Sequence, residues 1–309
     1  MATAIMAEPA TSPADLAEGA SLAPLTSIRV GGPADWLCSA RSSRSVVAAL
    51  SWARERDLRV AVVGRGSNLL VADAGFRGLV MRLAGGLTAI SARSGGRLWC
   101  GGAASLPRAV QRAAAHGLTG LEWGASIPGT AGGAVAMNAG AHHGELSEVL
   151  EWAVVCGPDG RRCVGPQDLD LGYRSSNLAP GEVVTTVSFT LRPGDPDAIA
   201  ARLAEFRAQR RSSQPQGVRT FGSVFTNPPG DSAGRLLEAA GCKDLRVGAA
   251  RFSPVHANFI EAEPGCRSQD VLELMAEGRR RVAASGGPAL EPEVRYLDPE
   301  RGIVRPPLP

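Results

Sequence analysis

The chain has 309 residues, of which 44% are hydrophobic and 20% are charged, and its formal net charge is +3. These values are typical of a globular protein of two or three domains, and they exclude a fibrous or largely disordered chain. The small net charge argues against binding to nucleic acid, which requires a clustered basic surface. The strongest basic cluster (Arg207, Arg210 and Arg211) is interpreted as the solvated face of a helix.

The six cysteines include no C-x-x-C pair, so neither a zinc site nor a redox motif is predicted. Reduced thiols are therefore expected, as in a cytoplasmic protein. Residues 1–21 lack the basic and continuous apolar segments of a secretory signal, and no apolar run approaches the roughly 18 residues of a membrane span. We expect a cytoplasmic protein without membrane insertion. A monomer is favoured, although no pattern reports on the oligomeric state.

Hydrophobic periodicity predicts both helices and strands in the first half of the chain. Residues 1–20 are expected to be a disordered N-terminus, followed by a short strand (residues 34–39) and an amphipathic helix (residues 43–56). A buried strand then begins at Arg59. Further signals predict a strand over residues 78–83, a hairpin turning at residues 94–96, and a helix over residues 106–116.

The second half begins with a glycine-rich segment. Residues 120–144 contain many glycines and alanines and almost no charge, which indicates that the backbone closely approaches another group. A hairpin turns at residues 158–160, and proline and glycine at residues 193–196 mark a domain boundary. The remaining elements are predicted to be strands over residues 183–192, 257–261 and 293–297 and helices over residues 196–211, 232–240 and 268–284.

The segment GRGSN, at residues 64–68, follows directly after a buried strand. Glycine frees backbone N–H groups there to form a nest for a phosphate or pyrophosphate. The segment lacks the spacing of the dinucleotide fingerprint, because Leu69 stands where that pattern needs glycine, and the chain has no Gly-Lys-Ser/Thr phosphate loop. A plain turn at the end of the strand is the alternative.

A second loop, residues 127–141, combines small residues with two polar side chains, Thr130 and Asn138. Two such loops can hold one extended cofactor, and a flavin dinucleotide is the favoured ligand. The alternative is close packing of a helix on a strand through small residues.

Seven separated segments, in one order, carry a family resemblance. The chain resembles UDP-N-acetylenolpyruvoylglucosamine reductases over nearly all of its length after residue 20. The segments are TSIRVGGPADW (26–36), VVGRGSNLLVADAGFRGLV (62–80), GLEWGASIPGTAGGAVAMNAGA (120–141), GYRSS (172–176), GSVF (222–225), HANFI (256–260) and LEPEVR (290–295).

This resemblance implies an α+β protein with a two-subdomain FAD-binding module of the vanillyl-alcohol-oxidase (PCMH-like) type, followed by an α+β substrate-binding domain. Residues 21–84 and 85–193 would form the two subdomains, and residues 194–309 the substrate domain. It also implies tightly bound, non-covalent FAD, with NADPH as co-substrate and a UDP-sugar as substrate. The implied cofactor contacts are Arg29, Gly64, Arg65, Gly66, Ser67, Asn68, Pro128, Gly129, Thr130, Gly133, Asn138, Gly140 and Ala141.

The resemblance further implies three catalytic residues. Arg174 would hold the substrate carboxylate bidentately and stabilise the developing enolate. Ser223 would donate a proton, which requires a rigid loop and stabilising neighbours. Glu293 would either be neutral through burial or act by orienting Arg174, and Glu291 is its local rival. Without the motifs, a surface salt bridge for Arg174 and a bond from Ser223 to its own loop are the alternatives.

Tyr173, Asn227, His256 and Asn258 are expected to contact the substrate, although a packed tyrosine and a structural histidine are the simpler interpretations of two of them. Two positions depart from the family: Thr226 replaces a longer or basic side chain, and His142-His143 replaces an aromatic. A covalent link of flavin to these histidines is not expected. The rival functions are an oxidase of the vanillyl-alcohol-oxidase type, which uses dioxygen, and a non-catalytic module that binds flavin or nucleotide.

Overall fold

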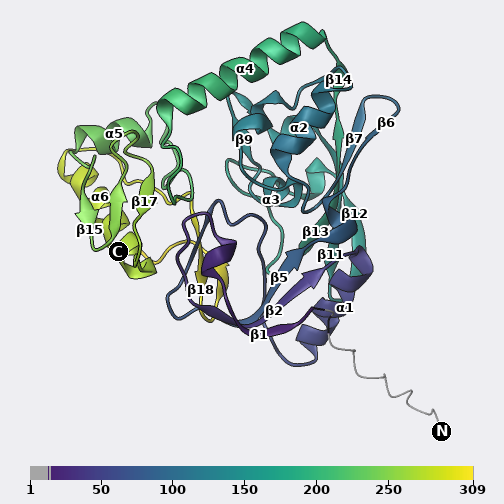
Figure 1. The fold of residues 1–309 in the computed structure, drawn as a ribbon, viewed down its shortest axis with the longest axis horizontal. Helices are drawn as coiled ribbons and strands as arrows, with labels where there is room; N and C mark the ends of the chain where they lie inside the picture. The colour runs from purple at the N-terminus through teal and green to yellow at the C-terminus, as the bar shows by residue number, and fades with distance from the viewer. Residues whose placement is uncertain (1–12, 14, 309) are drawn as a thin grey trace.

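The computed structural model describes residue 13 and residues 15–308, which form three parts (Figure 1). The first part lies at the bottom of the view in purple and blue, the second at the upper right in teal, and the third at the left in green and yellow. The expectation of disorder for residues 1–20 lies mostly outside the described residues. Residues 17–20, however, belong to a strand, so the first part begins before the expected boundary.

The first part is a four-stranded sheet in the order β1-β2-β5-β3. Its central strands are parallel, because α1 (Ser43–Arg54) carries the chain across one face between β2 and β3. Ser42 caps this helix through its side chain, and Ser45 returns the bond to the Ser42 backbone. The strands are β1 (Ala17–Ser21), β2 (Pro33–Ala40), β3 (Val60–Val62) and β5 (Phe76–Leu83).

The second part is a five-stranded antiparallel sheet in the order β12-β11-β13-β7-β6. One face packs on α2 (Leu106–Ala114) and α3 (Ala131–Ala136). The sheet strands are β6 (Ile90–Arg93), β7 (Arg97–Gly101), β11 (Leu150–Gly157), β12 (Gly160–Val164) and β13 (Val183–Thr190). Two small ribbons join β8 (Leu118–Thr119) to β14 (Arg192–Pro193) and β9 (Gly140–Ala141) to β10 (Gly144–Glu145).

Helix α4 (Pro196–Ser213) runs from the second part to the third along the top of Figure 1. It begins where the sequence predicts, because Asp195 caps it and Pro196 occupies its first turn. Only Ile199 and Leu203 of this helix are buried, so most of its surface faces solvent.

The third part packs α5 (Ala233–Ala239) and α6 (Ser268–Ala284) with a three-stranded sheet. The strands are β15 (Arg246–Val247), β16 (Ala250–Phe252) and β17 (Ile260–Ala262). The sequence prediction of a strand from residue 257 is wrong at its start. His256 accepts a bond from the Asn258 N–H through Nδ1, and its carbonyl accepts the Phe259 N–H, so residues 256–259 form a turn.

The chain then returns to the first part. Strand β18 (Arg295–Asp298) pairs in parallel with β4 (Leu69–Val71) and antiparallel with β19 (Gly302–Val304), a strand that the sequence analysis did not predict. One hydrophobic core joins Ile28 and Leu70 to Phe252 and Met275. The first and third parts therefore form one packed body, although they are far apart in sequence (Figure 1).

Asp73 strengthens this junction. Its carboxylate accepts the N–H groups of Ser268 (2.7 Å) and Gln269 (3.2 Å), in the first turn of α6, and its own N–H donates to Ser268 Oγ (2.9 Å). A residue of the first part thus satisfies the free donors at the start of a helix of the third part. Across the described residues, no helix has both the length and the apolar character needed to cross a bilayer.

Candidate active site

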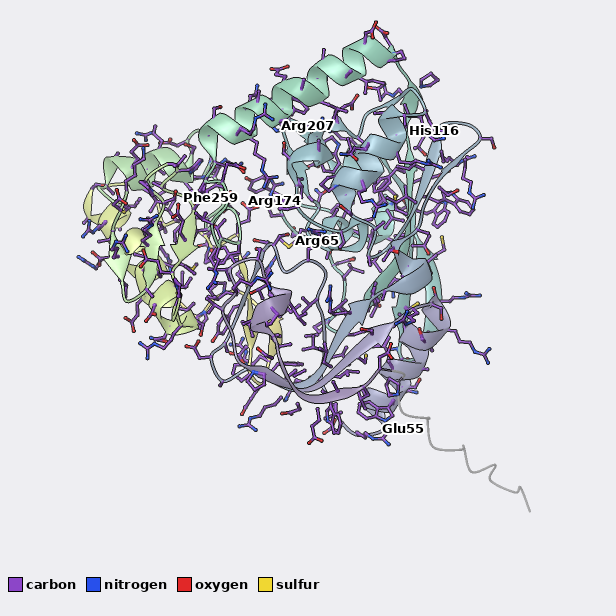
Figure 2. The ribbon with its side chains drawn as sticks, in the orientation of Figure 1. Glu55, Arg65, His116, Arg174, Arg207 and Phe259 are labelled. Atoms are coloured by element: carbon purple, nitrogen blue, oxygen red, sulfur yellow. The ribbon has the colours of Figure 1, made fainter. Side chains whose placement is uncertain are left out.

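A cavity of about 240 Å³ lies between the first and second parts. Gly64 and Arg65 line it from the loop after β3, and Thr130 and Gly133 line it from the start of α3. These four residues are predicted cofactor contacts, and the structure brings them together. Figure 2 shows Arg65 near the centre of the view.

Glycine allows the two loops to approach closely. A Cβ at Gly64 would lie 2.9 Å from Thr130 Oγ1, and a Cβ at Gly132 would lie 3.0 Å from the Gly102 carbonyl oxygen. Gly66 has a φ of +59°, and a Cβ there would lie 2.2 Å from the Leu25 carbonyl oxygen, so only glycine fits. The resulting surface of backbone and small side chains, open between two loops, fits an extended dinucleotide cofactor such as FAD.

Two arginines line this cavity, Arg65 and Arg82. Both are exposed, and neither has an ion-pair partner among the described residues. Two unpaired cations at one cavity favour an anionic ligand. The sequence analysis missed Arg82. The sequence does hold a clue to this residue. Arg82 lies near the carboxyl end of the parallel strand β5, and ligands of open sheets bind at that end of the strands.

Other predicted cofactor contacts lie away from the cavity lining. Arg29 is exposed, and its Nη1 donates to the Pro24 carbonyl (2.8 Å). Asn68 Nδ2 donates to the Glu293 carbonyl (3.2 Å), which links the GRGSN loop to the C-terminal segment. The remaining predicted contacts belong to the two loops but do not line the cavity, namely Gly66, Ser67, Pro128, Gly129, Gly140 and Ala141.

Asn138 occupies a different position from the one predicted. Its side chain is 1% exposed, its Oδ1 accepts the Ser147 N–H (3.1 Å), and its Nδ2 donates to the Gly172 carbonyl (3.1 Å). Both amide groups are therefore used inside the protein. The geometry supports a structural role in place of the expected contact between this side chain and the cofactor.

The predicted catalytic arginine and glutamate are in contact. Arg174 Nε donates to Glu293 Oε1 at 3.0 Å, and the two side chains are only 18% and 19% exposed. Arg174 Nη2 donates to the Gly140 carbonyl (2.7 Å), and its guanidinium lies 4.8 Å from the centre of the Tyr173 ring. Tyr173 is itself 55% exposed, so it covers the arginine and still faces solvent.

Arg174 occupies a left-handed backbone conformation, with a φ of +56°. It lies in a tight turn in which Gly172 and Ser175 exchange two backbone hydrogen bonds of 3.2 Å each. This conformation costs an L-residue about 1–2 kcal/mol, so the surrounding structure must hold it.

Burial raises the pKa of the Glu293 carboxyl, while the charges of Arg174 and Arg295 and the bond from Arg174 act in the opposite direction. Its N–H donates to the Val224 carbonyl (2.8 Å), and it precedes β18 instead of opening that strand as predicted. The rival, Glu291, is exposed and forms an ion pair with Arg305 (3.0 Å). The geometry therefore favours Glu293 over Glu291.

Ser223 lies in a loop that contacts the backbone of Glu293. It forms an isolated bridge with Phe259, and the next residue, Val224, accepts the Glu293 N–H through its carbonyl. The preceding Gly222 has a φ of +84°, and a Cβ there would lie 3.7 Å from the Ser67 carbonyl oxygen. The Ser223 hydroxyl has no hydrogen-bond partner among the described residues. It is thus held in a rigid loop between the GRGSN loop and Glu293.

Three predicted substrate contacts form hydrogen bonds within the third part. Asn258 is 3% exposed, and its amide exchanges two bonds with the Phe225 backbone, at 2.9 and 2.8 Å. His256 is engaged by the Asn258 N–H, and its ring packs against Phe259 with centroids 5.0 Å apart. Asn227 is exposed, but its Oδ1 accepts the Ala233 N–H at the start of α5 (3.1 Å). For His256 and Asn258 the structure favours the structural interpretation.

The two histidines that depart from the family form the turn between β9 and β10. His142 and His143 have φ values of +51° and +63°. The His142 ring stacks on Phe206 of α4 at 3.9 Å, and its Nε2 contacts Ser126 Oγ (3.2 Å). His142 thus holds α4 against the second part and does not line the cavity.

Comparison with known proteins agrees with this geometry. A profile for an FAD binding domain matches residues 34–164, and a profile for the C-terminal domain of UDP-N-acetylenolpyruvoylglucosamine reductase matches residues 214–297. The UDP-N-acetylenolpyruvoylglucosamine reductase of Anaeromyxobacter dehalogenans (strain 2CP-C) is 47% identical over 278 residues, covering 90% of this chain and 84% of that protein. The reductase of Myxococcus xanthus is 44% identical over 282 residues, covering 90% and 91%.

The chain belongs to the UDP-N-acetylenolpyruvoylglucosamine reductase family. The crystal structure of the reductase from Thermus caldophilus is similar, with a TM-score of 0.78 and 38% identity, covering 91% of this chain and 98% of that one. Membership confirms the predicted family, the α+β class, and an FAD-dependent oxidoreductase. Helix α4 lies between the two matched segments, so in this reductase it joins the FAD-binding module to the C-terminal domain.

Proposed function

We propose that this protein catalyses the NADPH-dependent reduction of UDP-N-acetylglucosamine enolpyruvate to UDP-N-acetylmuramate, in peptidoglycan precursor synthesis. The observation that carries this proposal is the partly buried ion pair of Arg174 and Glu293, next to the loop of Ser223. An enol ether with an attached carboxylate requires a cation for that carboxylate and a proton for the neighbouring carbon. The three side chains supply these functions.

When bound, FAD supplies two-electron storage, through which a hydride from NADPH passes to the substrate. Gly64, Arg65, Thr130 and Gly133 would hold this cofactor, because they line the cavity between the two subdomains. Arg65 and Arg82 would balance the negative charge of its pyrophosphate.

Arg174 would bind the substrate carboxylate and stabilise the enolate that develops during reduction. Its Nε is occupied by Glu293 and its Nη2 by the Gly140 carbonyl, so the guanidinium plane is fixed before the substrate arrives. Glu293 would act through this orientation. Tyr173, which lies over the arginine and is partly exposed, would contact the substrate from the solvent side.

Ser223 would donate the proton to the carbon beside the carboxylate. A serine hydroxyl is a weak acid, so it needs a fixed position and a nearby cation to stabilise the alkoxide it leaves. The bridge to Phe259 and the bond between Val224 and Glu293 fix the loop, and Arg174, the ion-pair partner of Glu293, would supply the cation.

A direct test is the oxidation of NADPH by the purified, flavin-loaded protein. Rapid oxidation only when the enolpyruvyl substrate is present, with formation of UDP-N-acetylmuramate, is the expected result. Arg174→Lys is expected to reduce turnover on the order of 10²-fold, because a point charge does not reproduce the planar fork. Production of hydrogen peroxide without the sugar nucleotide would instead support the oxidase, and flavin binding without either reaction would support a non-catalytic module.

A further inference from the structure

Arg174 lies in the Gly172–Ser175 turn. The backbone conformation of this turn is strained, so contacts within the turn are not enough to hold it. Arg174 has a left-handed φ of +56°, which L-residues rarely adopt, and two backbone bonds between Gly172 and Ser175 close the turn. If the residue at position 174 relaxed, its guanidinium would leave both Glu293 and the Gly140 carbonyl. Groups outside the turn must therefore keep it in place.

Two side chains bind the turn from outside, and they come from different parts of the protein. Asn138, after α3, donates from Nδ2 to the Gly172 carbonyl at 3.1 Å. Arg295, the first residue of β18, donates from Nη2 to the Arg174 carbonyl itself at 3.1 Å. One bond lies at the start of the turn, and the other lies at the strained residue.

Both side chains are themselves held firmly. Asn138 is buried, and its Oδ1 accepts the Ser147 N–H, which fixes the direction of its Nδ2. Arg295 is half-buried, and its N–H donates to the Asn68 carbonyl (3.1 Å), in the GRGSN loop. Neither residue lines the cavity, so their contacts are made to the turn and not to that space.

We propose that Asn138 and Arg295 are positioning residues, which hold the Gly172–Ser175 turn from opposite sides and so aim Arg174 at the substrate carboxylate. Arg295 has a second effect, because its charge also acts on Glu293. Asn138 has no such effect. The kinetic test of this proposal rests on the proposed function. The two residues are distinguished by the pKa of Glu293, on which only the charge of Arg295 is expected to act.

The test compares near-isosteric variants with matched controls in the flavin-loaded protein. Asn138→Asp keeps an acceptor for the Ser147 N–H, and it replaces the donor to the Gly172 carbonyl with a carboxyl oxygen in a buried position. Arg295→Lys keeps the charge and removes the planar fork, whereas Arg295→Met removes both. The controls are Asn177→Asp, where an exposed asparagine also donates to a carbonyl (Asp168, 3.1 Å), and Arg305→Met, where an exposed arginine pairs with Glu291.

We expect Asn138→Asp and Arg295→Lys to slow reoxidation of the reduced protein by the enolpyruvyl substrate on the order of 10²-fold, since small misplacement of a catalytic group has effects of this size. Reduction by NADPH and flavin content are expected to be unchanged. Calorimetric affinity of the oxidised protein for the substrate is expected to fall in the same variants. Only Arg295→Met should also move the acidic limb of the pH profile, to higher pH.

Parental rates and substrate affinity in the Asn138 and Arg295 variants would overturn the proposal, as would equal losses in the two controls. Loss of flavin from Asn138→Asp would likewise show that this residue maintains the cofactor site instead of aiming Arg174. If Asn138→Asp does not fold, the Arg295 variants still decide, because that side chain is only half-buried. An inactive parent would contradict the proposed function, whereas an active parent with unaffected variants would contradict only the positioning role.

Discussion

The third part of the molecule meets its two neighbours in different ways. Against the first part it shares a hydrophobic core, a parallel strand pair between β4 and β18, and the cap that Asp73 provides to α6. Against the second part, it forms a set of polar contacts: Arg174 with Glu293, Arg295 with the Arg174 carbonyl, and Arg210 of α4 with the Ser126 carbonyl. Helix α4 also packs on the second part through Ile199 and Leu203. We call the contact with the first part the apolar joint and the set of polar contacts the polar joint.

This difference explains where the chemistry lies. An apolar joint resists hydration and fixes geometry, but it offers no groups that bind an anion or move a proton. The polar joint provides those groups, and it can do so because the apolar joint already positions the third part. The two proposed catalytic residues of the third part, Ser223 and Glu293, thus lie between the apolar joint, which fixes their position, and the polar joint, which faces the proposed site.

The largest expected effect comes from a change at the polar joint that leaves both joints intact. Ser223→Ala removes a hydroxyl without a partner among the described residues, so the free energy of unfolding should remain within about 0.5 kcal/mol. Loss of a positioned acid should slow the reaction with the enolpyruvyl substrate on the order of 10²- to 10⁴-fold. Reduction by NADPH should keep its rate, because that step delivers no proton to the sugar nucleotide. Stopped-flow absorbance measures the two steps separately, and equal slowing of both would assign Ser223 to the flavin pocket.

A second pair of variants compares the joints directly. Leu70→Ala, in the fully buried apolar joint, should lower the free energy of unfolding by about 2–5 kcal/mol. Arg210→Met, which removes the bond from α4 to the Ser126 carbonyl at the polar joint, should cost about 0.5–1.5 kcal/mol, since this side chain is only half-buried. Urea unfolding of both variants measures the difference. Similar losses would mean that the two joints contribute equally to stability.

The smallest effect concerns the pH dependence of stability at the polar joint. Burial raises the pKa of Glu293 in the folded protein, so its contribution to stability is fully present below the ordinary glutamate pKa and is lost as the pH rises through the raised value. The stability of Glu293→Gln relative to the parent should therefore improve as the pH rises from about 4 towards neutrality. Thermal unfolding across this range measures the trend. A relative stability that falls with pH would mean that the bond from Arg174 outweighs burial.

Local patterns in the sequence predicted many elements correctly. Helix α6 spans the predicted residues, because its apolar spacing is regular over the whole length. The hairpins at residues 94–96 and 158–160 also form where glycine and proline predict them. The predicted strand over residues 257–261 begins three residues late, because a bond to the His256 side chain, which no backbone propensity reveals, folds residues 256–259 into a turn.

The sequence predicts the reactive residues of the candidate site, but it does not predict the side chains that hold them in position. Arg174, Ser223 and Glu293 lie in recognisable motifs, and the structure brings their segments together. A polar side chain in a glycine-rich loop is typical of a cofactor contact, so the sequence predicts that role for Asn138. Its hydrogen-bond partners lie 9 and 34 positions away in the sequence, where no local pattern reveals them. Arg295 was missed, although its place two residues after Glu293 in an extended segment puts both side chains on one face.

The pairing of β18 with β4 also sets an order of events during synthesis. Asn68 and Glu293 are 225 positions apart, so at ~5–20 residues per second the ribosome needs roughly 10–45 s between them. Throughout this interval, the emerged strand β4 has no β18 to pair with, and the residues of the first part that belong to the shared core lack their partners. The second part, whose sheet lies within residues 90–190, can fold during that time. The segment synthesised first is therefore among the last to complete its structure, and until then its apolar surface is a target for chaperones.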